Sequence, residues 1–281
     1  MAFLPNITLE KFKNDKMDSA FFNVDNLTIS FGGLLAVDKV SFKVNEKSIF
    51  SIIGPNGAGK TTIFNCISGL YMPNSGAIHF KGKNITGLKP HKVAKRGIAR
   101  TFQNIELFSR MTTMENLMLG RHIHIKINIL NGATFFRRKS KAALEEIKHR
   151  ERIEKIIDLL DLQSVRDQFV GSLPYGTQKL IELGRALALE PELLLLDEPS
   201  AGMNSEEKQD LIFWIKDIQE ELGITILLIE HDMKVVMDIS DRILAINFGK
   251  PIGEGTPEEI QGNPEVLKAY LGEEEFADVA F

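Results

Sequence analysis

The sequence predicts an α/β fold with a mostly parallel sheet, an N-terminal antiparallel β subdomain and an inserted helical subdomain. Alternating apolar and polar runs before residue 50 are typical of antiparallel strands. Two apolar runs at 192–197 and 224–230, joined by a helical stretch, are typical of parallel strands buried on both faces. Between 111 and 171 the pattern is mostly helical. Together these observations indicate a sheet core that carries a helical lobe.

Length and composition suit one folded unit in a reducing compartment. A chain of 281 residues, 43% of them apolar, can bury a sizeable core. The formal net charge of −4 gives no general attraction to nucleic acid, so no nucleic-acid partner is expected. Cys66 is the only cysteine, which excludes an intrachain disulfide. Because we find no membrane-spanning run and no signal peptide, we expect residues 1–21 to be an extension and 22–281 a single domain.

The first elements lead from antiparallel strands into a strand, a glycine-rich turn and a helix. Strand-like runs at 27–31 and 40–44 flank a pair of glycines. A buried strand then ends at residue 53, and helical spacing continues from 61 to 68. The order strand, glycine turn, helix is what a phosphate-binding site requires.

The helical subdomain is expected at about 104–185, inserted in the α/β core. A second helix in it should run from about Gln178 to Leu189 and be opened by Gly176. An apolar stripe marks the main helix, with these members: Leu144, Ile147, Ile153, Ile156, Ile157 and Leu160.

After this lobe the α/β core resumes. The helix between the two buried strands should be capped by Asn204, with Glu207 in the capping-box position. A last strand at 242–248 precedes a glycine-rich turn and a helix opened by Thr256 with Glu259.

The run GPNGAGKTT, residues 54–62, matches the phosphate-loop pattern G-x-x-x-x-G-K-[ST] and lies between a strand and a helix. It indicates a P-loop NTPase core in which Lys60 meets the β and γ phosphates, Thr61 gives a hydroxyl to Mg²⁺ and Thr62 is a further donor. A glycine turn that binds nothing is the alternative. The residues expected to bind the nucleotide here are Gly54, Pro55, Asn56, Gly57, Ala58, Gly59, Lys60, Thr61 and Thr62.

Two acids end an apolar strand at Asp197 and Glu198, where an open α/β sheet gathers its ligand-binding groups. We expect Asp197 to hold Mg²⁺ through water and Glu198 to act as general base on the attacking water. Taken alone, a solvated acidic strand end would explain the pair equally well. The phosphate loop in the same chain favours the catalytic interpretation.

The run LPYGTQ, residues 173–178, resembles the signature motif of ABC ATPases. The resemblance covers nearly all of 22–271. It implies that Phe31 stacks on adenine, that Gln103 is a catalytic and metal-contacting glutamine, and that His231 is the catalytic switch histidine. Without the resemblance, His231 could be structural and Phe31 an ordinary core aromatic.

In that family ATP lies between the phosphate loop of one subunit and the signature of a second, identical or paralogous subunit. The signature residues here that would serve the partner's nucleotide are Pro174, Tyr175, Gly176 and Thr177. Three positions depart from the usual pattern: Pro174 replaces serine, Thr177 replaces glutamine, and Asn204 replaces an aspartate. Importers of branched-chain amino acids look similar at this motif, and three further segments resemble theirs, at 31–37, 197–204 and 262–274.

We therefore expect an ATP-binding and ATP-hydrolysing subunit that energises an ABC membrane importer for branched-chain or other hydrophobic amino acids. The resemblance implies ATP and Mg²⁺ as cofactors, membrane-spanning permease subunits as partners, and an indirect solute-binding protein. It also implies a peripheral location at the cytoplasmic face of the inner or plasma membrane, with a contact near Gln103 to Phe108. Alternatives are an ABC ATPase of lipid-type export or urea uptake, and a soluble regulatory ABC ATPase.

A basic and aromatic run at 135–139 could meet the membrane partner or anionic lipid. The alternative interpretation is a solvated charged loop.

Overall fold

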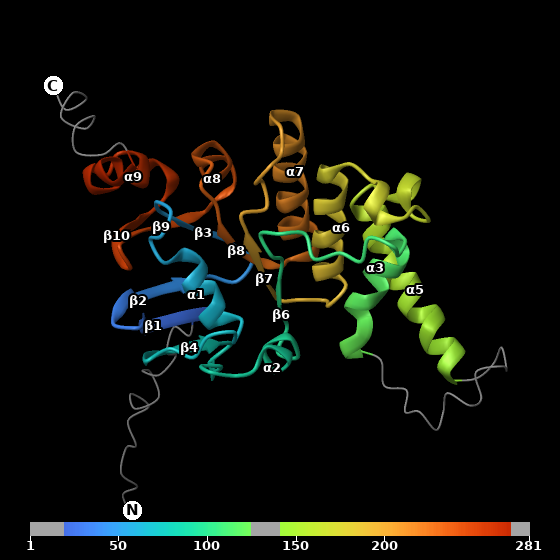
Figure 1. The fold of residues 1–281 in the computed structure, drawn as a ribbon, viewed down its shortest axis with the longest axis horizontal. Coiled ribbons are helices and arrows are strands. Elements are labelled where there is room, and N and C mark those ends of the chain that lie inside the picture. Colours follow the sequence, from blue (N-terminus) through green and yellow to red (C-terminus); the bar gives the residue numbers. More distant parts are fainter. Residues whose placement is uncertain (1–19, 125–140, 271–281) are drawn as a thin grey trace, which may run out of the picture.

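The computed structural model describes residues 20–124 and 141–270. Two sheets and a group of helices make up this part of the chain (Figure 1). The α/β class with an antiparallel sheet and a mostly parallel sheet is confirmed. Within 20–124 and 141–270, none of the helices has the length and apolar character needed to cross a bilayer. The run at 135–139 lies outside the described residues.

The N-terminal sheet is antiparallel, as predicted, and has the order β2-β1-β4-β5. Alternate side chains of β1 point into the core, where Phe22 and Val24 are fully buried. Phe22 pairs with Val44 on one neighbour and Phe80 on the other. The strands are β1 (Phe22–Phe31), β2 (Leu34–Val44), β4 (Ser75–Phe80) and β5 (Lys83–Asn84).

The second sheet has the order β10-β9-β3-β8-β7-β6, and every neighbouring pair is parallel except β9 with β10. All residues of β7 and β8 are buried, as the unbroken apolar runs predict. Because β3, β7 and β8 are parallel neighbours, the loops after them emerge at one edge. The strands are β3 (Ile49–Ile53), β6 (Ile98–Arg100), β7 (Leu193–Asp197), β8 (Thr225–Ile229), β9 (Arg242–Asn247) and β10 (Lys250–Gly255).

Helices of the core begin where the sequence signals indicate. Asn204 and Thr256 each form the predicted capping box, with Glu207 and Glu259. The helix after the phosphate loop starts at Lys60, one residue earlier than expected. The core helices are α1 (Lys60–Ile67), α2 (Pro90–Ala94), α7 (Ser205–Leu222), α8 (Met233–Ile239) and α9 (Pro257–Gln261).

Most of the predicted helical stretch forms a lobe on the β6 side of the second sheet (Figure 1). It contains α3 (Thr113–Leu119), α5 (Lys141–Leu159) and α6 (Tyr175–Leu187), with short 3₁₀ turns at Gly120–His124, Gln163–Val165 and Val170–Ser172. The domain boundaries that we expected from sequence stay predictions.

Two expectations in this lobe are wrong in detail. The apolar stripe of α5 is buried only in its second half: Ile153 and Ile157 have no exposure, whereas Leu144 is 59% and Ile147 49% exposed. The start of α5 projects beyond α6 in Figure 1, which agrees with the exposure of this part of the stripe. Helix α6 begins at Tyr175, directly after Pro174, and ends at Leu187, so Gly176 lies inside the first turn and does not precede the helix.

Candidate functional site

The phosphate loop follows β3 and turns directly into α1. Its glycines Gly54, Gly57 and Gly59 have φ values of 150°, 81° and 104°, a region that side-chain-bearing residues rarely adopt. A Cβ added to Gly59 would lie 2.6 Å from the carbonyl oxygen of Ala36. The glycines are therefore required both by the backbone conformation and by the close approach of β2.

The Lys60 side chain folds over this loop. Its Nζ donates to the carbonyl oxygens of Gly54 at 2.6 Å and Pro55 at 3.0 Å, and the residue is 5% exposed. Burial lowers the pKa of Lys60, an effect that the negative charges of Glu198 and Asp197 partly oppose. Lys60 is thus a desolvated cation held at the rim of the loop.

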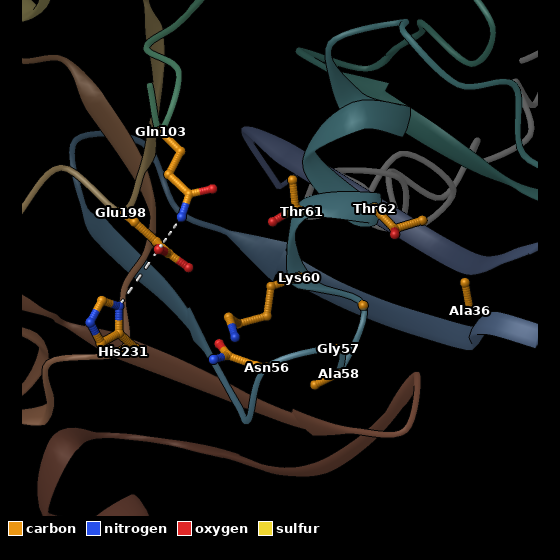
Figure 2. A pocket seen from close by; sticks show the side chains of 11 residues that line it. Ala36, Asn56, Gly57, Ala58, Lys60, Thr61, Thr62, Gln103, Glu198 and His231 are labelled. Atoms are coloured by element: carbon orange, nitrogen blue, oxygen red, sulfur yellow. Dashed lines mark hydrogen bonds and ion pairs between the residues drawn. The ribbon is translucent and has the colours of Figure 1, made fainter. Parts of the chain in front are cut away.

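A cavity of about 450 Å³ opens in front of the loop. Figure 2 shows Gln103, Glu198 and His231 together on one side of it, with Lys60 and Asn56 beside them and Thr61 and Thr62 farther along. Ala36, which comes from β2, also lines the cavity and was not predicted from the sequence. The lining residues are Ala36, Asn56, Gly57, Ala58, Gly59, Lys60, Thr61, Thr62, Gln103, Glu198 and His231.

Glu198 is the meeting point of three separate loops. Gln103 Nε2 donates to its Oε2 at 2.8 Å, and His231 Nδ1 lies 3.7 Å from the same oxygen. The Glu198 backbone has φ of 48°, in the left-handed region that non-glycine residues occupy mainly at strained or functional positions. The geometry presents a carboxylate, an amide and an imidazole to one wall of the cavity.

Asp197 occupies a different environment from its neighbour. It is 2% exposed and does not line the cavity. Arg100 Nη2 donates to its Oδ2 at 2.7 Å, and Arg100 Nη1 bonds Asn65 and Ser68 in or next to α1. Arg100 could not be predicted from the sequence, because a single arginine before Gln103 belongs to no motif of its own.

Glu230 is a third residue that was not predicted from the sequence. Its carboxylate is fully buried and accepts backbone N–H groups from Ser200 at 2.8 Å and His231 at 3.0 Å. It therefore joins the loop that carries His231 to the loop that follows Glu198. An acid directly after an apolar strand and before the histidine was the available signal.

Other predicted site residues do not line this cavity. Phe31, 44% exposed at the end of β1, packs its ring edge to face with Tyr71 at 5.2 Å between centroids. Pro174 is the residue before α6, and the rest of the signature forms its first turn. The predicted residues that do not line the cavity are Phe31, Gly54, Pro55, Asp197, Pro174, Tyr175, Gly176 and Thr177.

Comparison with known proteins decides the family. The sequence profile of the ABC transporter family matches residues 37–201, and that of the branched-chain amino acid ATP-binding cassette transporters matches 250–275. The chain belongs to the ABC transporter family. The chain is accordingly an ATP-binding protein, and the glycine cradle with its buried lysine fits the phosphates of such a ligand.

Several relatives of this ABC protein share nearly its whole length. The high-affinity branched-chain amino acid transport ATP-binding protein BraF of Pseudomonas aeruginosa is 46% identical, covering 92% of this chain and 100% of the relative. LivG of Escherichia coli, with the same description, is 42% identical over the same shares. An ABC transporter cassette solved in its ADP conformation superposes with a TM-score of 0.78 at 32% identity, covering 90% of this chain and 99% of that one.

Proposed function

We propose that this chain hydrolyses ATP to energise an importer of branched-chain amino acids. The names of BraF and LivG support the solute class, since these relatives match over nine tenths of the chain. The match of residues 250–275 to the branched-chain amino acid cassettes supports it independently.

The contacts of Glu198 are the main support for hydrolysis. Its carboxylate lines the cavity, so it can accept a proton from a water held there. Gln103 and His231 lie at 2.8 and 3.7 Å from the same oxygen and can orient that carboxylate and the water. We assign Glu198 as general base, His231 and Gln103 as the groups that complete its wall, and Lys60 as the phosphate-binding cation.

The metal-binding residues are proposed on donor chemistry. The Thr61 hydroxyl and the Gln103 side chain line the cavity and are oxygen donors of the kind that Mg²⁺ prefers. Mg²⁺, when bound, neutralises charge on the phosphate oxygens. Asp197 can take part only through water, since its Oδ2 is bonded to Arg100 and the residue does not reach the cavity wall.

A second ATP-binding subunit, identical or paralogous, completes each site in this proposal. The Pro174 to Thr177 turn opens α6 but does not line the chain's own cavity. Backbone N–H groups at a helix start can face an anionic phosphate, so these residues are assigned to the nucleotide of the second subunit. Phe31 and Tyr71, both partly exposed beside each other, are assigned to the adenine ring.

The subunit is proposed to act at the cytoplasmic face of a membrane, bound to permease subunits. Exposed aromatics near the Gln103 loop support a contact there, since Phe102 is 40% and Phe108 57% exposed. A solute-binding protein would join the complex only through the permease.

Reconstitution tests the solute class and the coupling. The chain should be coexpressed with its permease subunits, reconstituted in vesicles together with the solute-binding protein, and assayed for ATP-driven uptake of radiolabelled leucine. We expect uptake with wild type and loss of it with Glu198→Gln. ATP-driven uptake of an unrelated solute, with none of leucine or other branched-chain amino acids, would contradict the proposal.

A further inference from the structure

A short helix at residues 264–270 packs against the end of β3, where the phosphate loop begins. Val266 of this helix is 3% exposed and belongs to one buried cluster with Ile53, the last residue of β3. At the start of the helix, Asn263 Oδ1 accepts the N–H groups of Glu265 at 2.9 Å and Val266 at 3.4 Å. The 264–270 helix is therefore capped and anchored next to the phosphate loop.

The phosphate loop separates two cavities. Its residues Asn56, Gly57 and Ala58 line both the nucleotide cavity and a second cavity of about 780 Å³, which the 264–270 helix borders on the far side. Close packing therefore cannot fix this part of the loop, and its position must depend on bonds at its ends. At the far end, the Gly249 N–H donates to the Ala58 carbonyl oxygen at 2.9 Å.

Tyr270 of the helix contacts the near end of the loop. Although Tyr270 is 37% exposed, burial raises the pKa of its phenol to about 12. The backbone N–H of Gly54 donates to the phenol oxygen and opposes this rise. A Cβ added to Gly54 would lie 2.1 Å from the carbonyl oxygen of Ile246, so Gly54 is also packed tightly against β9.

The carbonyl group of the same glycine binds Lys60. Its oxygen accepts Lys60 Nζ at 2.6 Å, so Tyr270 and Lys60 bond the two polar groups of one residue. In the proposed function, the Lys60 ammonium exchanges carbonyl oxygens for phosphate oxygens when ATP binds. A loop that is already held in the required shape loses less conformational entropy on binding, and therefore binds more tightly, than one that must first be ordered.

We infer that Tyr270 is a positioning residue for the phosphates of ATP, because its hydroxyl group fixes Gly54 and Gly54 sets the reach of Lys60. The inference rests on the proposed ATPase function. It adds to the nucleotide site a residue from 250–275, the part of the chain that matches the branched-chain amino acid cassettes. Tyr270 does not line the nucleotide cavity, so its loss should weaken nucleotide binding and leave the chemical step at Glu198 unchanged.

The test uses Tyr270→Phe, which removes the hydroxyl group and keeps the ring. Ser164→Ala, which removes an exposed hydroxyl group from the helical lobe, is the matched control. Titration calorimetry measures binding of Mg²⁺-ADP, which carries the β phosphate and is not turned over. Steady-state assays give KM and kcat for ATP, and thermal unfolding without nucleotide reports stability.

For Tyr270→Phe, the Kd for ADP and the KM for ATP should both rise about tenfold, while kcat stays within about twofold of wild type. The unfolding midpoint without nucleotide should fall by about 4 °C at most, because a single hydrogen bond is lost. Ser164→Ala should match wild type in all four quantities.

Three results would contradict these expectations. Wild-type affinity of Tyr270→Phe for ADP, with or without a lower unfolding midpoint, would overturn the inference and leave the proposed function standing. A wild-type chain that binds neither ADP nor ATP would contradict the proposed function itself. Should Tyr270→Phe not fold, Tyr270→Met also lacks the oxygen, and wild-type ADP affinity in that variant would overturn the inference equally.

Discussion

Arg100 is the residue on which the buried side of the site depends. The Arg100 and Asp197 side chains are 7% and 3% exposed, and Arg100 Nη2 donates to Asp197 Oδ2 at 2.7 Å. Arg100 Cζ also lies over the ring of Phe102, 5.1 Å from its centroid. The guanidinium, which belongs to β6, therefore connects α1 and β7. Arg100 and Asp197 neutralise each other, since either partner alone would be an uncompensated buried ion.

Arg100→Met should destabilise the fold by about 3–5 kcal/mol, because it leaves the Asp197 carboxylate buried and unpaired. Urea unfolding followed by circular dichroism measures this. Arg166→Met is the control, since Arg166 and Glu154 are 32% and 41% exposed, and a loss of about 1 kcal/mol or less is expected. Equal losses of unfolding free energy in the two variants would contradict the assignment of Arg100 and Asp197 as a buried pair that the fold depends on.

At the level of elements, helix starts connect the sheet edge to the site. The Asn204 side chain accepts the N–H groups of Glu206 and Glu207, and Glu207 returns a bond to the Asn204 N–H. At the same end of α7, Lys208 Nζ bonds Asp232 Oδ2 at 2.6 Å, next to His231. Helix α7 thus supports the loop that bears the histidine.

Asn204→Ala should cost about 1 kcal/mol by removing the cap acceptor, whereas Asn204→Asp keeps it and should be near neutral. Thermal unfolding of both variants at one pH distinguishes them. A stability of the alanine variant equal to wild type would show that the cap contributes nothing.

The Lys208–Asp232 pair should make the stability of the fold depend on pH. The hydrogen bond from Lys208 lowers the pKa of Asp232 below its usual 3.8. Because its pKa is lower in the folded state, Asp232 stabilises the fold at pH values above 3.8. This contribution is lost as the pH falls through the folded-state pKa. Lys208→Met should therefore lose up to about 1 kcal/mol at pH 7 and progressively less below pH 4.

Urea midpoints at pH 7 and pH 3 measure the difference. Lys216→Met, on the exposed face of the same helix, is the control and should show no such dependence. A loss in Lys208→Met that is equal at both pH values would contradict the linkage.

Sequence reasoning succeeded where one element contains the whole signal. The phosphate loop, the capping boxes at Asn204 and Thr256, and the buried strands are contiguous patterns, so local physics predicts them. It failed for Arg100 and Glu230, because their partners lie 97 and 30 residues away and only the tertiary fold brings them together. The exposed first half of α5 was missed for the same reason.

For the whole molecule, the proposed two-subunit arrangement predicts that one chain carries only part of each nucleotide site. The cavity holds the phosphate loop, Glu198, Gln103 and His231, while the signature turn lies outside it. Closing a nucleotide between two surfaces of this kind would exclude water and bring the signature to the phosphates. ATP should therefore act as the bridge between two subunits, and hydrolysis should separate them.

The most direct test of this account is ATPase activity of wild type and Glu198→Gln, with the mass of each followed by light scattering in Mg²⁺ and ATP. We expect Glu198→Gln to hydrolyse about 10² to 10⁴ times more slowly, because it lacks the general base, and to accumulate as a dimer that wild type forms only transiently. Normal turnover by Glu198→Gln, or a mutant that binds ATP and stays monomeric, would contradict the account.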